Sequence, residues 1–499
     1  MNLLPFFVIV PLGAAFITPV FSRFWKGFPD WLGNLSSAFL MGLSFWCLRF
    51  TKDTLVYYAG GWEPFDGIPV GIAMVMDGLT ILMLLIINVI AFLVMIYSVP
   101  FITNSTDKGK YYTLLLLMLT GLNGFVLAGD IFNLFVFLEI TSIASFALVA
   151  FGLESESFEA SFKYQVLGGV ASLIILLGIA FLYHLTGTLN MADASRILNN
   201  TGSNPAVLFV GTLLLVGFSF KAGMIPFHAW LPDAYPSAPA SISAMLAGAG
   251  SKVLGVYALI RIFFNVFGMA VMPSVLSIFL ILGTLSMVVG SLLALGQKDF
   301  KRLLAYSSIG QIGYAVFALG LGTPLGILGG LFHLLNHSVF KSLLFLNSGA
   351  IVYATGNRDL ESMGGLSQRM RVTSTTSLIG SLSVSGIPPL GGFWSKLIII
   401  IAAVESGQHI LAGVAILVSI VTLAYYMKVQ KLAFFGTLGA AYQKVKEVPV
   451  LMCVPMVVLA LLSLGLGILL LPQLRAIVLD PAVKVIEQGV GYAEMVLGG

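Results

Sequence analysis

Hydrophobic residues occupy long runs along this chain rather than alternating with polar ones. Apolar runs of about 20 residues, the length that an α-helix needs to cross the hydrocarbon core of a bilayer, recur from the start of the sequence to beyond position 470. Charged residues gather mainly in the short connections between these runs. The pattern therefore predicts an all-α polytopic membrane protein embedded in the lipid bilayer.

Hydropathy predicts about 14 transmembrane helices. The expected spans are 3–21, 31–50, 72–97, 111–129, 131–151, 161–185, 205–225, 240–266, 270–295, 303–320, 326–352, 373–404, 409–435 and 449–471. The span 373–404 is long for one helix and contains Gly386-Ile387-Pro388-Pro389, so we expect a broken helix near Pro388. The residues after Leu471 mix apolar and charged positions and are expected to lie in the membrane interface.

Composition agrees with this interpretation. The 499 residues are 58% hydrophobic and 9% charged, whereas a soluble domain carries about 25% charged residues. Cys47 and Cys453 lie far apart in apolar runs, which predicts neither a disulfide framework nor a cysteine metal site. The opening residues MNLLPFFVIV lack a basic leader and a cleavage site, so we expect a retained first helix. We expect no nucleic-acid partner.

The distribution of Lys and Arg predicts the orientation of the chain. Fifteen of these residues, with Lys301 among them, fall in one set of alternate loops, and six, with Arg261 among them, fall in the other. Cytoplasmic loops carry the excess of positive charge. We therefore expect an even number of spans, both termini outside the cytoplasm, and a location in the cell membrane of a prokaryote.

Seven titratable residues remain inside the predicted spans. They are Glu139, Lys221, Lys252, His333, His337, Lys341 and Lys396. A charged side chain at the centre of a transmembrane helix costs about 2.5–3.5 kcal/mol on insertion scales, and such residues generally mark ion pathways. These positions are therefore the candidate functional residues.

Glu139 and Lys221 are candidate partners. Glu139 lies in the middle of DIFNLFVFLEITSIAS, where it must be protonated, paired or hydrated. Lys221 is followed by Gly223 and Pro226, so its helix is expected to break or bulge there and to free carbonyl groups. The alternatives are a fixed structural ion pair and a kink that serves packing only.

Lys252 and the sequence HLLNHSVFKSLLF extend this set. Lys252 lies about 18 Å into its span, too deep to reach the interface easily. His333, His337 and Lys341 follow at spacings of four residues, which places them along one helix face over about 12 Å. An HxxxH pair can bind zinc, but no carboxylate or cysteine accompanies it here. A proton relay is therefore favoured over metal binding or packing, and we expect no metal.

Lys396 follows a second proline break. The sequence GIPPLGGFW beside Lys396 is similar to GMIPFHAW beside Lys221. The two spans run in opposite directions, as an inverted repeat requires. The expected units are residues 1–110, a first five-helix repeat at 111–266, a second inverted repeat at 267–435, and a final helix with a tail at 436–499.

Three polar residues outside this set are secondary candidates. His228 and Asp233 follow the proline break after Lys221 and could line a channel mouth or lie in a loop. Asp130, like Asp77, falls at the edge of a span, where solvation at the interface suffices.

Four motifs identify a family resemblance. They are AGDIFNLFVFLE, FKAGMIPFHAWLPDAYPSAPASISAMLAGAGSK, FHLLNHSVFKSLLFL and GIPPLGGFWSK. With these motifs the chain resembles the antiporter-like subunits shared by complex I, multisubunit Mrp cation/proton antiporters and membrane-bound hydrogenases. It is most similar to the D-type subunit of Mrp antiporters and its hydrogenase relative, whereas a complex I subunit of the M type would carry glutamate in place of Lys396.

The resemblance implies a fold of fourteen helices with two inverted five-helix repeats. It implies that Glu139 is the glutamate of the fifth helix and Lys221 its lysine partner at the break of the seventh. The other implied members of the proton relay are Lys252, His333, His337, Lys341 and Lys396.

The predicted function is proton translocation along this axis, coupled to Na⁺/H⁺ antiport in an Mrp-type complex with other membrane subunits. One alternative is a proton-pumping subunit of a membrane-bound hydrogenase or NADH-quinone oxidoreductase. Two others are a stand-alone secondary transporter and a structural subunit whose buried charges only specify assembly. No cysteine cluster or glycine-rich phosphate loop is present, so we expect no cofactor and no redox catalysis in this chain.

Overall fold

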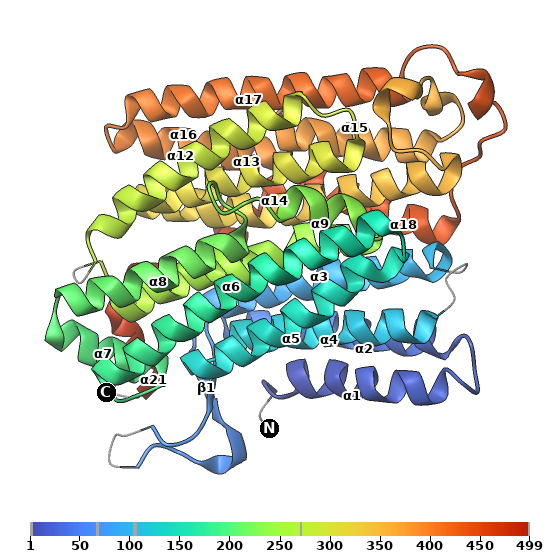
Figure 1. Cartoon of the computed structure of the whole chain (residues 1–499). Helices are drawn as coiled ribbons and strands as arrows, with labels where there is room; N and C mark the ends of the chain where they lie inside the picture. The colour runs from blue at the N-terminus through green and yellow to red at the C-terminus, as the bar shows by residue number, and fades with distance from the viewer. Residues whose placement is uncertain (1–2, 66–68, 103–106, 270–271, 498–499) are drawn as a thin grey trace.

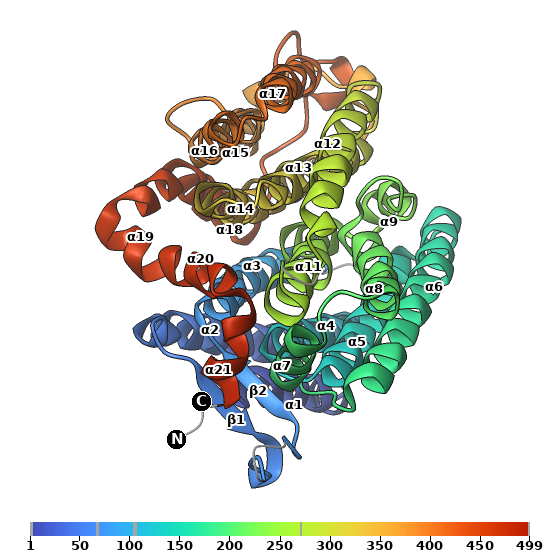
Figure 2. The same ribbon diagram turned by 90° about the vertical axis from the view of Figure 1, so that its left-hand side faces the viewer.

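The computed structural model describes residues 3–65, 69–102, 107–269 and 272–497, and it shows a bundle of long, roughly parallel helices (Figure 1). The first part of the chain forms α1 (Phe6–Phe21), α2 (Phe28–Cys47), η1 (Leu48–Phe50) and α3 (Gly78–Phe101). Between η1 and α3, strands β1 (Leu55–Tyr58) and β2 (Ala73–Met76) pair in antiparallel fashion, with Leu55 opposite Met76. This hairpin extends from the bundle near both chain ends (Figures 1 and 2).

The middle of the chain contributes a second group of helices. They are α4 (Lys108–Leu127), α5 (Ile131–Val149), α6 (Ser155–Thr186), α7 (Met191–Thr201), α8 (Pro205–Ala222), α9 (Leu231–Ser237) and α10 (Ala240–Met245). The helix that begins with α10 continues to Phe267 through π-helical segments. These are η4 (Leu246–Gly250), η5 (Lys252–Tyr257) and η6 (Arg261–Phe267), with the short α11 (Ala258–Ile260) between the last two.

The last part of the chain lies above the first in the end-on view of Figure 2. It contains α12 (Ser274–Leu295), α13 (Phe300–Gly320), α14 (Pro324–Thr355), α15 (Arg371–Ser385), α16 (Gly391–Glu405) and α17 (His409–Val429). The chain then returns as α18 (Val450–Gly465) and η11 (Leu466–Leu470). It closes with α19 (Pro472–Val478), α20 (Asp480–Glu487) and α21 (Tyr492–Leu497).

The helical class of the fold is confirmed. Within the described ranges, eleven helices are long and apolar enough to cross a membrane. Helix α1 is apolar but shorter, and α14 and the α15–α16 pair are not among the eleven. Fourteen spans and an inverted repeat of five helices therefore stay predictions.

Two helices break close to the predicted positions. Helix α8 ends at Ala222 because Gly223 adopts a left-handed conformation with φ of 71°. Helix α15 ends at Ser385, where Gly386 has a φ of 83°. Only glycine adopts this conformation without a steric cost, so each glycine fixes the place where its helix stops.

The chain end folds back onto the bundle. Helix α20 packs against α3 and α14, and α21 packs against α7. The Tyr492 ring lies 4.9 Å from the Arg261 guanidinium, and Arg261 is only 1% exposed. Lys301 is also buried. Counting these two residues as loop charges was therefore wrong, although the bias between the two sets of loops keeps its direction without them.

Candidate functional site

Lys221 lies in the last turn of α8, directly before the break at Gly223, and is 3% exposed. Its ammonium group donates hydrogen bonds to the Ser142 hydroxyl of α5 at 3.1 Å and to the Gly168 carbonyl of α6 at 3.4 Å. The lysine is thus held between two neighbouring helices by neutral oxygen atoms.

Glu139, the predicted partner, lies one turn before Ser142 on α5. The carboxylate interacts electrostatically with Lys221, but among the described residues no ion pair within 4.0 Å joins the two. One oxygen of Glu139, Oε1, is buried without a hydrogen-bond partner in the same part of the chain. In the described structure the two side chains are therefore neighbours without a direct ion pair, because the Lys221 ammonium group binds Ser142, one turn further along α5. We call this the open arrangement.

Lys252 is completely buried, and its amine has no hydrogen-bond partner among the residues that the structure describes. It begins the π-helical segment η5, a type of distortion that often marks functional sites. A side chain at Gly255, one turn later, would clash with the Ala222 backbone. Gly255 therefore allows the helix of Lys252 to pack directly against the residue that follows Lys221.

The two histidines of α14 are also buried. His333 Nδ1 lies 3.0 Å from the hydroxyl of Ser395 on α16. The His337 ring, centred 6.5 Å from that of His333, has no hydrogen-bond partner at either nitrogen within the described ranges. His337 interacts electrostatically with Lys252, Lys341 and His333.

Lys341 is fully buried two turns beyond His333 on α14. Its ammonium group donates to the Leu304 carbonyl of α13 and to the Tyr426 hydroxyl of α17, each at 3.1 Å. The Tyr426 hydroxyl in turn lies 3.0 Å from the hydroxyl of Ser307. Lys341 therefore begins a chain of hydroxyl groups that links three helices.

Lys396 lies on α16, after the second break, and is 3% exposed. Its ammonium group is 4.6 Å from the centre of the Tyr314 ring and lacks a hydrogen-bond partner in the described chain. A cavity of about 220 Å³ reaches it between Gly386 and Leu423. The ring face offsets part of the cost of burying this charge.

The seven predicted residues form three local groups. Glu139 lies beside Lys221, Lys252 lies near His337 and Lys341, and His333 lies near Lys396. The first and second groups are linked by the packing of Gly255 on Ala222. Groups bonded to neutral polar atoms and groups with unpaired nitrogens both occur along this row, and such an arrangement can pass protons when water or a small movement bridges the gaps.

The three secondary candidates lie in different surroundings. His228 is half-buried in the turn after α8, and its Nδ1 has no hydrogen-bond partner in the described ranges. Asp233 forms ion pairs with Lys163 at 3.2 Å and Arg302 at 3.5 Å.

Asp130 caps α5 by accepting a hydrogen bond from the Asn133 amide at 2.8 Å, and burial raises the pKa of its carboxyl group. This is a structural role. No group of three or more potential metal ligands occurs among the described residues.

Several contributors were not predicted from the sequence. Ser142, Ser395, Tyr426 and Tyr314 each contact a predicted residue, but an isolated Ser or Tyr carries no charge to mark it. For Tyr314, the spacing of polar residues along α13 could have indicated a functional position. Ser307, Gln311 and Tyr314 recur at spacings of four and three residues and therefore share one face of a largely apolar, buried helix.

Asp77 forms a second buried site with Arg261. The two side chains make an ion pair at 2.8 Å, and both are almost fully buried. Arg261 also donates to Thr80 and Asn265. The expectation that solvation at the interface suffices for Asp77 was wrong, because α20 and α21 cover this end of the bundle.

Comparison with known proteins places this geometry in a family. Residues 128–422 match the family model described as NADH:quinone oxidoreductase/Mrp antiporter, transmembrane. Residues 62–112 match that of the NADH-ubiquinone oxidoreductase (complex I) chain 5 N-terminus. The first match contains all seven candidate residues.

Among curated relatives, the N-type subunit of the NADH-quinone oxidoreductase of Desulforudis audaxviator is 34% identical over 83% of this chain and 84% of its own length. The D-type subunit of the Na⁺/H⁺ antiporter of Alkalihalophilus pseudofirmus is 34% identical over 85% of this chain and 86% of its own length.

Two solved structures have the same fold. A chain of the Mrp complex from Dietzia sp. superposes with a TM-score of 0.89 at 26% identity. A chain of the membrane-bound sulfane sulfur reductase, an archaeal respiratory membrane complex, also reaches 0.89, at 33% identity. Each match covers 99% of both chains. The chain belongs to the NADH:quinone oxidoreductase/Mrp antiporter family of membrane subunits.

Proposed function

We propose that this chain is a proton-translocating, antiporter-like subunit of a multisubunit membrane complex, coupled to Na⁺/H⁺ antiport in an Mrp-type system. The observation that carries the proposal is the row of buried titratable groups on α5, α8, η5, α14 and α16. In the described chain, Lys252, His337 and Lys396 lack hydrogen-bond partners for their side-chain nitrogens. Leaving such groups unpaired is costly, which supports transient protonation or hydration over a purely structural role.

The open arrangement at Glu139 supplies the mechanism of the first step. Lys221 exchanges its hydrogen bonds to Ser142 and Gly168 for an ion pair with Glu139. The ion pair favours the protonated lysine, and its opening favours release of the proton toward Lys252. The proton then passes along His337 and Lys341, and through His333 to Lys396, as these groups change partners.

The same geometry fits a second host. The N-type subunit of NADH-quinone oxidoreductase is as similar in sequence as the antiporter subunit, and the sulfane sulfur reductase chain is more similar than the Mrp chain among the structures. A redox-driven complex is therefore the alternative. In either host we infer partner membrane subunits, two inverted five-helix repeats, and a prokaryotic cell membrane with both termini outside the cytoplasm.

The test measures proton movement in membrane vesicles that contain the whole complex. Glu139→Ala and Lys221→Ala are expected to abolish it while the complex still assembles, and Lys444→Ala, an exposed loop lysine, serves as the matched control. Wild-type rates in both buried variants would contradict the mechanism.

Two further measurements separate the remaining alternatives. Full antiport by the chain alone, without partner subunits, would support a stand-alone transporter. A Lys252→Ala complex that assembles poorly but pumps normally would support a structural role.

A further inference from the structure

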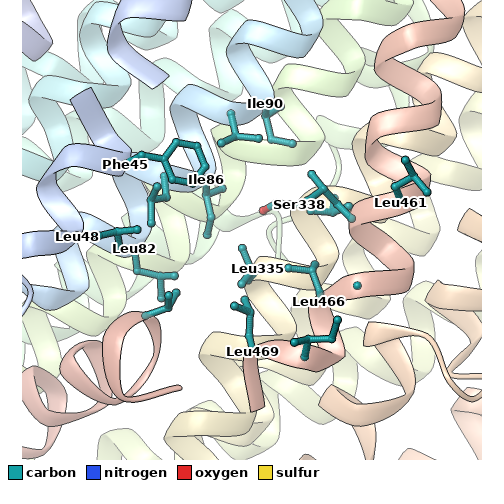
Figure 3. A pocket seen from close by; sticks show the side chains of 17 residues that line it. Phe45, Leu48, Leu82, Ile86, Ile90, Leu335, Ser338, Leu461, Leu466 and Leu469 are labelled. Carbon is teal, nitrogen blue, oxygen red and sulfur yellow. The ribbon is translucent and has the colours of Figure 1, made fainter. Parts of the chain in front are cut away.

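A second pocket lies away from the titratable groups, between α2, α3, α14 and α18. Its volume is about 400 Å³. Figure 3 shows Phe45, Leu82 and Ile86 on one side of the open space, and Leu335, Leu466 and Leu469 on the other. Protein interiors are closely packed, so an open recess of this size offers room for another molecule.

The lining excludes a polar occupant. Among the described residues that line the pocket, Ser338 has the only polar side chain, and that hydroxyl already donates to the Leu334 carbonyl at 3.0 Å. None of these lining residues has a buried side-chain N or O atom without a partner. Apolar cavities do not hold ordered water but bind apolar molecules. A quinone head group would likewise find no free hydrogen-bonding partner here.

The pocket opens on the outside of the helix bundle, beside the candidate membrane span α3. Three of its lining residues are also exposed on the outside of the bundle: Phe45 at 52%, Leu461 at 61% and Ile468 at 56%. On α3 the lining runs from Leu82 to Ile90, which is about 6–18 Å from the start of that helix. Because α3 is a candidate membrane span, this stretch lies within the hydrocarbon core, where lipid acyl chains are the surrounding apolar molecules.

We propose that this pocket binds an acyl chain of a phospholipid from the surrounding bilayer. The chain would lie against α14 between α3 and α18 and contact only apolar side chains. It would recover the dispersion contacts that an empty pocket forfeits. The same contacts would join α2 and α3 to the C-terminal helices α18 and α19.

The position of the pocket gives this lipid a role in the proposed proton transfer. Leu335, Ser338 and Val339 share one face of α14, whereas His337 and Lys341 point to another. An acyl chain on the first face would keep water away from the back of the helix that carries these groups. This role rests on the proposed function, but the lipid site itself does not.

Gly465 offers a direct test. It lines the pocket, and a Cβ atom added there would meet nothing within 4 Å, so Gly465→Phe introduces a large side chain at a position that tolerates one. Gly413 on α17 is equally open but lies outside the pocket, so Gly413→Phe is the matched control. Gly465→Leu is a second, smaller filling variant.

The full chain, purified with its accompanying subunits in mild detergent, is analysed for bound lipid by mass spectrometry. We expect wild type and Gly413→Phe to retain phospholipid, and Gly465→Phe to retain about tenfold less. Delipidation should lower the Tm of wild type, phospholipid vesicles should restore it, and Gly465→Phe should be insensitive to both. Phospholipid retention in both filling variants equal to that of wild type, or recovery of a quinone or of no lipid from wild type, would overturn the proposal.

Because the readouts are lipid retention and Tm, they do not depend on transport. A wild-type chain that holds phospholipid but moves no protons would contradict the proposed function alone. A chain that moves protons and binds no lipid would contradict the lipid site alone.

Discussion

The two broken helices carry their lysines in different ways. At the first break, Lys221 precedes the glycine and donates to Ser142 and Gly168. At the second, Lys396 follows the glycine, lies over the Tyr314 ring and has no hydrogen-bond partner in the described chain. The first lysine has a carboxylate nearby, and the second has an aromatic face and a cavity.

This difference indicates different tasks for two similar sequence motifs. A lysine with alternative partners can be switched, because two arrangements of similar energy compete for it. A lysine that lies beside a cavity and has no hydrogen-bond partner in the described chain can exchange a proton with a molecule that enters the cavity. We therefore infer that the first break controls the transfer and that the second is its terminus.

The largest expected effect distinguishes charge from proton exchange at the two breaks. Lys221→Arg and Lys396→Arg both keep a positive charge, but arginine does not release its proton in proteins. Each is expected to reduce proton movement by about 10²-fold or more, the usual contribution of a positioned proton-transfer group. The measurement is dye-reported proton movement in vesicles, normalised to assembled complex. Normal transport in Lys396→Arg would show that the second break needs only charge.

The next effect concerns the ring under Lys396. Tyr314→Phe keeps the aromatic face, whereas Tyr314→Leu removes it, which costs about 2 kcal/mol for a desolvated cation. We expect Tyr314→Leu to lower the transport rate by more than tenfold and Tyr314→Phe to lower it much less. Equal rates in the two variants would show that the aromatic ring does not contribute to proton transfer at Lys396.

A smaller effect is expected at Ser142. In Ser142→Ala, Lys221 loses one neutral partner, worth about 1 kcal/mol, and the balance shifts toward the ion pair with Glu139. The transport rate should change by several-fold, and the change should be smaller in the Glu139→Asp background, where the shorter carboxylate reaches Lys221 less well. A double-mutant cycle measures this coupling, and additive effects of the two substitutions would contradict it.

The smallest effect on transport is expected at Asp130. Asp130→Ala removes the cap of α5 and should destabilise the protein by about 1 kcal/mol, seen as a lower Tm. Its transport rate should stay near that of wild type. A loss of transport without a change in Tm would show that Asp130 takes part in proton transfer.

The sequence predicted the features that depend on local chemistry. Gly223 and Gly386 end their helices near the expected breaks, and the lysines and histidines of the predicted axis are buried. It did not predict that Lys221 would contact Ser142, or that Tyr314 would lie under Lys396. Those contacts depend on how each helix is rotated and packed against its neighbours, which periodicity within one helix does not determine.

Tertiary packing also explains why two buried charged residues were wrongly assigned to loops. Arg261 and Lys301 stand near the ends of apolar runs, as interface residues do. Arg261 is buried because α20 and α21 fold over it and Asp77 lies opposite. Lys301 is buried because its ammonium group donates to the carbonyls of Pro236 and Ala238. Asp77, Pro236 and Ala238 all lie far in sequence from the charged residue that they contact.

We propose that one path joins the two breaks, and Lys252 is the first of the residues between them. The most direct measurement is proton movement by vesicles that contain the assembled complex with Lys252→Met, a substitution of similar size without a titratable group. A continuous path predicts loss of proton movement although Glu139, Lys221 and Lys396 are intact. Wild-type proton movement in this variant would contradict a continuous axis.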